Sequence, residues 1–347
     1  MITHNDLLVN DLEQFLTENQ VRRAVIIADR EVCQLHGNFF RSFPCNYCTY
    51  PLKVSETKKN WQEIEKIMKF MLREKITTDT WLVNVGGGVI CDMGSLSATL
   101  YKRGMHVLNI PTTLLSMIDA AWGGKTGVNM SKVKNAIGTY NNDYHVFIDI
   151  SFLKTLPAKE LWSAVGEMFK YALIADKNLW KKLGTLPTSE KMINMEMIPY
   201  DWIQTCIEIK QHFVLQDFRD TGIRRVLNAG HTLGHAIESL CANKNILTHG
   251  HAVALGLIAE AYISAKQRFL PMNTAKEIKS KILPLFPAPR LSSRDKTIMY
   301  HLIENDKKNN HGKICLPLIQ EIGKCSPLQY TLREEILEAF SFLEESG

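Results

Sequence analysis

The sequence predicts an α/β N-terminal domain with a parallel sheet, followed by a mostly α-helical C-terminal domain. Strand and helix patterns alternate over roughly the first 150 residues, whereas long helical patterns dominate afterwards. Three consecutive glycines, Gly86–Gly88, separate a strand pattern from a helix pattern. We place the domain boundary after residue 153, which gives domains 1–153 and 154–347.

The N-terminal domain contains short apolar runs of strand length and amphipathic runs of helix length. Strands are predicted at 24–29, 81–85, 106–110 and 145–150. A helix is predicted at 61–76, because its apolar residues at 64, 67, 68, 71 and 72 share one face. A second helix follows the glycines at 89–104. This alternation is typical of a parallel sheet covered by helices.

The C-terminal domain is predicted to be helical, with one hairpin near its end. Helices are expected at 158–176, 200–218, 227–240 and 249–269, and the hairpin at 312–325. A cleft between two such domains is the usual place for a small-molecule site.

Composition excludes several classes of protein. The net charge of +5 is mild, and basic residues do not form the stripe that nucleic-acid binding requires. The N-terminus lacks the features of a signal peptide, and apolar runs are too short to span a membrane, so a cytoplasmic protein is expected. Among eight cysteines only Cys45 and Cys48 form a C-x-x-C pair, and reduced thiols are expected.

The glycine turn Gly86–Gly88 is suited to a phosphate group. Glycines at a strand end let the backbone approach a ligand, and the N–H groups of the following helix point at it. The G-x-G-x-x-G fingerprint is absent, so a turn needed only for packing is the alternative. Asp29, at another strand end, is a candidate for ribose hydroxyls.

A second glycine-rich stretch, DAAWGGKTGVN at 119–129, resembles a P-loop only superficially. The first glycine of a P-loop would fall at Asp119, and a carboxylate there would repel a triphosphate. We therefore reject a nucleoside triphosphatase and expect Lys125 to bind another anion.

Histidines and a glutamate in apolar helical segments indicate a divalent metal. His231 and His235 lie four residues apart and share a helix face, and His249 and His251 begin the next helix. Glu167 adds a carboxylate. Two imidazoles and one carboxylate with an open position suit catalytic zinc. The spacing does not decide which two of the four histidines bind it.

Cationic residues occur within segments that otherwise look buried. They are Lys125, Lys134, Lys170, Lys210 and Arg224. Together they suit a substrate that carries a phosphate and a carboxylate.

These residues resemble the 3-dehydroquinate synthase family. The matching stretches include GGGVICD, IPTTLLSMIDAAWGGKTGVN, KNAIG, GEMFKYALI, GIRRVLNAGHTLGHAIE and HGHAVALG, in order over about residues 81–260. The resemblance implies a Rossmann-like N-terminal domain, bound NAD, zinc or cobalt, and a homodimer. It also implies conversion of 3-deoxy-D-arabino-heptulosonate 7-phosphate to 3-dehydroquinate and phosphate, a step of the shikimate pathway.

The resemblance also implies roles for individual residues. The metal ligands are Glu167, His231 and His249, with His235 on the substrate side. The NAD contacts are Asp29, Glu56, Lys59, Gly86, Gly87, Asp92, Thr112, Thr113, Leu115, Asp119 and Lys134. The substrate contacts are Arg103, Asp119, Lys125, Asn135, Lys170, Lys210, Arg224, Asn228, His235 and one of Lys307 and Lys308.

The chain departs from the family pattern without losing an implied metal ligand or substrate cation. The departures are Glu31, Cys91, Ala120, Trp122, Gly127, Val133 and His251. They are expected to loosen the NAD site or to change rates. His251 replaces a usual glutamate, and we keep His249 as the ligand with His251 beside it.

Three other functions remain open. One is another sugar-phosphate cyclase that makes inosose- or valiolone-type rings, and one is a metal-dependent polyol dehydrogenase of the same fold. The third is a non-catalytic relative. The intact GGKT and KN stretches favour dehydroquinate formation.

Overall fold

The computed structural model describes residues 2–3, 8–131, 133–241, 247–304 and 314–344, with side chains from Leu12 onward. The chain forms two compact units, Met1–Leu156 and Pro157–Gly347. None of the described helices is long and apolar enough to cross a membrane.

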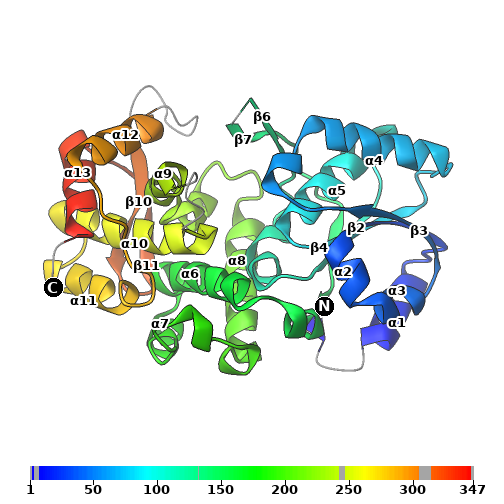
Figure 1. Ribbon diagram of the computed structural model, residues 1–347, viewed down its shortest axis with the longest axis horizontal. Coiled ribbons are helices and arrows are strands. Elements are labelled where there is room, and N and C mark those ends of the chain that lie inside the picture. Colours follow the sequence, from blue (N-terminus) through cyan, green and yellow to red (C-terminus); the bar gives the residue numbers. More distant parts are fainter. Residues whose placement is uncertain (1, 4–7, 132, 242–246, 305–313, 345–347) are drawn as a thin grey trace. The chain divides into compact units, whose positions relative to one another are not determined.

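A five-stranded parallel sheet forms the centre of the first unit (Figure 1). In spatial order its strands are β3 (Asn46–Leu52), β2 (Arg23–Asp29), β4 (Trp81–Gly86), β5 (Val107–Pro111) and β8 (Tyr144–Val146). Val25 pairs with Cys48 on one side and Leu82 on the other. The chain leaves β2 for the edge strand β3 and then returns to β4 on the far side of β2. The strand order therefore reverses between β2 and β4, which is where open α/β sheets bind ligands.

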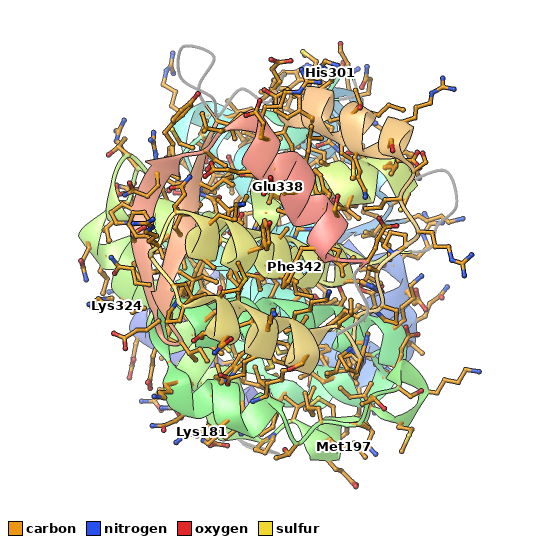
Figure 2. All side chains as sticks on the ribbon, turned by 90° about the vertical axis from the view of Figure 1, so that its left-hand side faces the viewer. Lys181, Met197, His301, Lys324, Glu338 and Phe342 are labelled. Atoms are coloured by element: carbon orange, nitrogen blue, oxygen red, sulfur yellow. The ribbon has the colours of Figure 1, made fainter. Side chains whose placement is uncertain are left out.

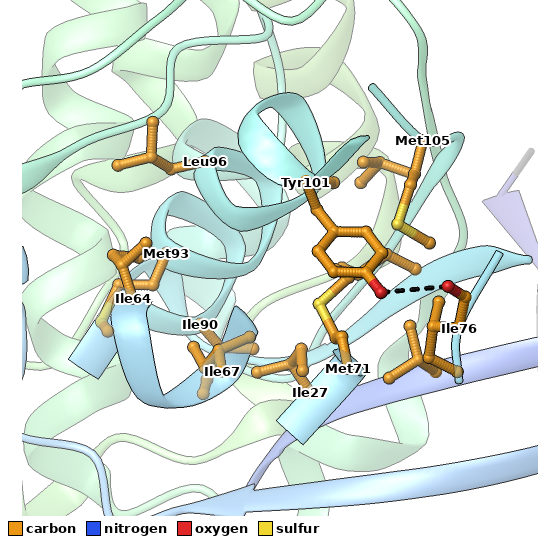
Figure 3. Packing of buried hydrophobic residues seen from close by; sticks show 14 of the residues in the cluster. Ile27, Ile64, Ile67, Met71, Ile76, Ile90, Met93, Leu96, Tyr101 and Met105 are labelled. Atoms are coloured by element: carbon orange, nitrogen blue, oxygen red, sulfur yellow. Dashed lines mark hydrogen bonds between the residues drawn. The ribbon is translucent and has the colours of Figure 1, made fainter. Parts of the chain in front are cut away.

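Helices α4 (Trp61–Arg73) and α5 (Gly88–Leu100) cover part of this sheet with apolar side chains. Figure 3 shows Ile64, Ile67 and Met71 of α4 in the same core as residues of α5. Tyr101, just after α5, donates a hydrogen bond to the carbonyl of Ile76 at 3.0 Å. The expected apolar face of α4 is confirmed except at Leu72, which is 60% exposed.

The remaining elements of the first unit are short. The helices are α1 (Leu8–Glu18), α2 (Arg30–Leu35) and α3 (Gly37–Arg41). The short helical turns are Glu56–Lys58, Tyr101–Arg103, Ser116–Ala120 and Ile150–Thr155. The strands are β1 (Ile2–Thr3), which pairs with β9 (Ile148–Asp149), and the antiparallel pair β6 (Val128–Met130) and β7 (Val133–Ile137).

The second unit is mostly helical, as expected. Its helices are α6 (Ala158–Ala175), α7 (Lys177–Leu183), α8 (Tyr200–Gln216), α9 (His231–Cys241), α10 (His249–Lys266), α11 (Met272–Ile282), α12 (Ser293–Glu304) and α13 (Arg333–Phe342). Strands β10 (Cys315–Glu321) and β11 (Lys324–Tyr330) form the antiparallel hairpin. Short turns lie at Glu190–Met192, Met195–Met197 and Ile223–Asn228.

Helix α10 is the buried centre of this unit. Its residues Val253, Leu257 and Ile258 are fully buried, so it is apolar on several faces. Its first turn crosses α6 so closely that a Cβ on Gly250 would lie 1.6 Å from the carbonyl oxygen of Ser163. Only glycine fits this crossing.

Helix α13 packs against α10 on the face of the unit shown in Figure 2, where Glu338 and Phe342 are labelled. The Tyr262 hydroxyl donates to Glu338 at 3.0 Å, and its ring lies 4.8 Å from that of Phe342. The C-terminal helix thus closes the core of the second unit.

Several details differ from the sequence-based expectation, which also did not include the β6–β7 hairpin or helices α7 and α11 to α13. The edge strand β3 was not expected, because it contains Pro51 and pairs only with β2. The strand predicted at 145–150 is two short strands, β8 and β9, with different partners. Helix α9 begins at His231 rather than at residue 227, because a tight turn with Gly230 at φ +77° precedes it.

Candidate functional site

Three possible metal ligands converge in the second unit. Glu167 comes from α6, His231 from the first residue of α9 and His249 from the first residue of α10. The Nε2 atoms of His249 and His231 lie 3.0 and 3.3 Å from Oε1 of Glu167. Their ligand atoms all lie within 4.8 Å of one another. One carboxylate and two imidazoles at this separation fit a divalent cation such as zinc.

Burial is graded across this group. The side chain of Glu167 is 1% exposed, that of His231 13% and that of His249 31%. Lys170, one turn along α6, is also 1% exposed, and its Nζ lies 2.6 Å from Oε2 of Glu167. A buried carboxylate is costly unless it is paired, and Lys170 supplies that pairing.

The electrostatics keep these donors in the forms that bind metal. Burial would raise the pKa of Glu167, but Lys170 and His231 outweigh it and hold that pKa well below its usual range. Burial lowers the pKa of His231, although Glu167 partly opposes this. At neutral pH the glutamate is therefore ionised, as a metal ligand must be, and the lowered pKa of His231 favours its neutral, metal-binding form.

Backbone contacts orient the two histidines. Nδ1 of His231 lies 3.1 Å from the carbonyl oxygen of Ala229, a position for donation by an Nδ1–H, and Nε2 faces Glu167. The N–H of Gly230 donates to the buried carboxylate of Glu260 at 2.7 Å, which holds the start of α9. The Ser163 hydroxyl accepts from the N–H of Gly250 at 3.1 Å, which ties α10 to α6 beside Glu167.

The other two histidines take different positions. The ring of His235 lies 5.4 Å from that of His231 and 5.6 Å from that of His249, so it borders the group. His251 instead donates through Nε2 to the carbonyl of Pro287 at 2.9 Å. Burial lowers the pKa of His251, although the bond to Pro287 opposes this. Its Nε2 is therefore engaged with the loop after α11, and it does not join the ligand group.

The three cationic residues that the sequence singled out in the second unit are buried, as expected. Lys170, Lys210 and Arg224 are 1%, 8% and 1% exposed. Arg224 donates through Nη1 to the carbonyl of Phe218 at 2.5 Å. Asn228 lies at the end of the turn that contains Arg224 and is half-buried. Lys307 and Lys308 lie outside the described residues.

Several of the predicted NAD residues lie at the ends of strands where the sheet order reverses. Gly86 and Gly87 end β4 and begin α5, whose N-cap Gly87 provides no capping side chain. A Cβ on Gly87 would approach the Thr113 side chain to 3.1 Å, so the bare backbone forms a cradle there. These backbone groups fit a dinucleotide pyrophosphate. Asp29 ends β2 and accepts from the N–H of Glu31 at 3.0 Å.

The segment after β5 lies beside this turn. The N–H of Thr112 donates to the carbonyl of Gly86 at 3.0 Å, and the hydroxyl of Thr113 bonds to that of Ser116 at 2.8 Å. Leu115 and Asp119, both half-buried, follow on the same helical segment.

A buried lysine joins residues predicted for two different ligands. Nζ of Lys59 lies 2.5 Å from Asp92 and 2.6 Å from the amide oxygen of Asn135. Burial raises the pKa of Asp92, although Lys59 opposes this. Glu56 lies nearby in the chain and accepts from Asn129 at 2.7 Å. Asn135, predicted for substrate, is thus held by a residue predicted for NAD.

Lys125 and Lys134 are exposed on the segment around β6 and β7. A strand, Val128–Met130, follows Lys125 where a P-loop requires a helix. This finding supports the rejection of a nucleoside triphosphatase.

Arg103 is not brought to the glycine turn. It follows the C-terminal end of α5, whereas Gly86 and Gly87 lie at its N-terminal end. Thirteen helical residues separate them by about 20 Å. The side chain of Arg103 is exposed, and its backbone has a φ of +72°. Arg103 lines a cavity of about 350 Å³ with Thr78, His106 and Tyr140.

Three residues of the site were missed from the sequence. Glu238 lies three residues after His235 and joins a second possible ligand group with His235 and His249. Glu260 and Asp217 hold the backbone before His231 and Arg224. The i, i+3 spacing of His235 and Glu238 was visible in the sequence, but the contacts of Glu260 and Asp217 were not.

Comparisons with known proteins agree with this description. Residues 49–163 match the model of the 3-dehydroquinate synthase N-terminal domain, and residues 164–309 match that of the C-terminal domain. A 3-dehydroquinate synthase of Parabacteroides distasonis is 33% identical over 347 residues, covering 98% of this chain and 96% of that protein.

Two solved structures share the fold. A 2-epi-5-epi-valiolone synthase from Streptomyces hygroscopicus, with NAD+ and Zn2+ bound, has a TM-score of 0.84 at 24% identity, covering 99% of this chain and 95% of that one. A 2-deoxy-scyllo-inosose synthase complexed with carbaglucose-6-phosphate, NAD+ and Co2+ has a TM-score of 0.83 at 21% identity, covering 98% and 95%.

Proposed function

The chain belongs to the 3-dehydroquinate synthase family, and we propose that it converts 3-deoxy-D-arabino-heptulosonate 7-phosphate to 3-dehydroquinate and phosphate. It is accordingly an enzyme, a phosphorus–oxygen lyase. The observation that supports the proposal best is the group formed by Glu167, His231 and His249 with Lys170 beside it. A carboxylate and two imidazoles for a metal adjoin a buried cation for an anionic substrate.

The cofactors are NAD and a divalent metal, zinc or cobalt. Both solved structures described above carry NAD+ with one of these metals. When bound, NAD+ supplies reversible hydride exchange, and the metal supplies a Lewis acid for the substrate hydroxyls and the transient ketone. Glu167, His231 and His249 would hold the metal. The glycine turn and the residues around it would hold NAD.

The substrate passes through oxidation at C5, loss of phosphate, reduction and an aldol ring closure. Lys125, Lys170, Lys210 and Arg224 neutralise its phosphate and carboxylate, whose charge would otherwise oppose binding. His235 borders the metal ligands and moves a proton at a substrate hydroxyl. Arg103, Asn135 and Asn228 complete the proposed polar contacts.

The nearest alternative is another sugar-phosphate cyclase, because the two structural neighbours make inosose and valiolone rings. The substrate-binding cations favour a substrate that also bears a carboxylate. A polyol dehydrogenase would instead accumulate NADH, since its cofactor is not returned to the oxidised form.

Phosphate release tests the proposal. Purified protein with NAD+ and Zn2+ should release one phosphate per 3-deoxy-D-arabino-heptulosonate 7-phosphate, without net NADH. Chelator should abolish this activity, and Zn2+ or Co2+ should restore it. Sugar phosphates that lack a carboxylate serve as controls. Turnover of those controls alone, or steady accumulation of NADH, would contradict the proposal.

A further inference from the structure

A second set of possible metal ligands borders the first. His235 and Glu238 lie on α9 at i and i+3, so both project from one side of the helix. Together with His249 of α10 they place three ligand atoms within 4.8 Å of one another. We refer to Glu167, His231 and His249 as the inner set, and to His235, Glu238 and His249 as the outer set.

The outer set has the same chemistry as the inner set. Each offers two imidazoles and one carboxylate, which is a donor set for zinc and cobalt with room for water. The three histidine rings are nearly equidistant, at 5.3, 5.4 and 5.6 Å between centroids. His249 therefore adjoins both imidazole–carboxylate pairs.

The two sets differ in burial. Glu167 and His231 are 1% and 13% exposed, whereas every residue of the outer set is only half-buried. Lys170 pairs with the inner carboxylate. A cation that arrives from solvent reaches the outer set without desolvating a buried carboxylate. A cation in the inner set gains more from the low dielectric of the interior.

His249 can serve only one of these positions at a time. A neutral imidazole has one unprotonated nitrogen and so binds one ion. Filling either set withdraws His249 from the other. The two positions are therefore alternatives for a single ion.

We propose that the protein has a second, weaker position for a divalent transition metal at His235, Glu238 and His249, which a cation occupies when the inner set is disabled or not yet filled. The proposal rests on the proposed metal at the inner set. It does not depend on which sugar phosphate the enzyme converts. An ion in the outer position engages His235, which the proposed mechanism reserves for substrate, so the inner position is the active one.

A double-mutant cycle tests the outer position. The metal-free full-length protein is titrated with CoCl2, and binding is followed by calorimetry and by visible absorption of the bound ion. H231A disables the inner set and should still bind one Co2+ per chain, more weakly than the wild type. Adding E238Q to H231A should weaken binding by a further tenfold or more, about the loss expected for a ligand. E238Q alone should change the wild-type Kd by less than about threefold.

Control variants separate the alternatives. E208Q on the H231A background makes the same charge change on α8, where Glu208 is exposed, and should leave the Kd of H231A unchanged. H249A removes the shared ligand and should weaken both positions. E167Q replaces H231A as the background if H231A does not fold, as judged by circular dichroism.

Two results would overturn the proposal. Equal Kd values for H231A and H231A/E238Q would show that His235 and Glu238 are an ordinary helix-surface pair. A tenfold loss of Co2+ affinity in E238Q alone would show that Glu238 acts on the ion bound by the inner set. A wild type that binds no Co2+ would refute the inner site itself. A wild type that binds Co2+ but releases no phosphate would refute only the proposed reaction.

Discussion

Single side chains decide the protonation and orientation of the metal-binding group. Lys170 lies 2.6 Å from Glu167 within a buried site and stabilises the ionised glutamate. The carbonyl of Ala229 accepts from His231 and so sets its tautomer. Because both partners are fixed by the fold, the donors are arranged before a metal arrives.

His251 provides a test at this scale. Replacing it by alanine removes the hydrogen bond to Pro287 and should lower the free energy of unfolding by about 1 kcal/mol. Metal content should stay near one ion per chain, because His251 is not in the inner set. Chemical denaturation and metal analysis of the purified protein measure the two effects. Loss of the metal would show that His251, not His249, is the ligand.

Lys125 provides a second test. Its side chain is exposed, so K125M should leave stability within about 0.5 kcal/mol of the wild type. Loss of a charge that binds the substrate should lower kcat/KM for phosphate release by about a hundredfold, about 2.7 kcal/mol. K53M, at another exposed lysine of the same unit, is the matched control and should be unaffected. Wild-type kinetics in K125M would refute its role.

At the scale of elements, helix crossings and turns place the site residues. Helices α6 and α10 cross at Gly166 and Gly250, directly beside Glu167 and His249. The turn after α8 is organised by Asp217, whose carboxylate accepts from the N–H groups of Thr221, Gly222 and Arg224. The positions of Glu167, His249 and Arg224 thus depend on backbone contacts at or next to these residues.

The helix crossing is tested by G250A. The added methyl group would meet the Ser163 carbonyl, so α6 and α10 must separate, at a cost of about 1–3 kcal/mol. Metal affinity should fall as well, because His249 moves away from Glu167. G37A is the control, since a Cβ there meets only the end of the Arg41 side chain, at an ordinary contact distance of 3.4 Å. Cobalt titration and thermal unfolding distinguish G250A from the control variant. A cobalt affinity of G250A equal to that of the wild type would show that this crossing does not position His249.

The turn after α8 gives a pH-dependent prediction. Burial would raise the pKa of Asp217, but three backbone N–H groups outweigh it and lower that pKa below its usual 3.8. A carboxyl with a lowered folded pKa stabilises the protein above the unfolded pKa, and this contribution is lost as pH falls through the folded value. D217N should therefore be less stable than the wild type by a constant amount between about pH 5 and 7, and the difference should shrink below about pH 4. Urea unfolding across this range measures it, and a stability difference at pH 3 as large as that at pH 6 would contradict the prediction.

At the scale of the whole molecule, the chain separates its proposed cofactors between two compact units. The inner metal set lies entirely in Pro157–Gly347, and the glycine turn lies in Met1–Leu156. Each unit has its own buried lysine–carboxylate pair, Lys170–Glu167 and Lys59–Asp92. The residues proposed for one cofactor are therefore distinct from those proposed for the other.

This separation predicts opposite losses in two variants. E167Q should lose at least about tenfold in Co2+ affinity and keep wild-type NAD+ binding. K59M should weaken NAD+ binding and keep one Co2+ per chain. Both should lose phosphate release, because the proposed reaction needs both cofactors. Calorimetric titration with each cofactor measures the effects, and loss of both cofactors in either variant would contradict their independence.

Much of this protein was determined by the sequence itself. Short apolar runs that alternate with helical patterns predicted the parallel sheet, and helical patterns predicted α4 to α6 and α8 to α10, because apolar residues record which parts of an element are buried. The spacing of His231 and His235 predicted a shared helix face. Among the elements missed, β3 and the β6–β7 hairpin are at an edge or exposed, so burial leaves little pattern in them. Helices α7 and α11 to α13 have buried apolar faces but were not identified from the sequence.

Only the tertiary structure decided which groups meet. The sequence offered four histidines, and the packing of α10 against α6 and α9 places two of them on Glu167 while Pro287 engages His251. The tertiary structure also brings the carboxylate of Glu260 to the N–H of Gly230, and Glu238 close to His249. No local pattern encodes these pairs. The physical reason is that local patterns specify which face of an element is buried. Contacts between side chains distant in sequence depend instead on the angle and closeness at which elements pack, set here by glycines at the crossings.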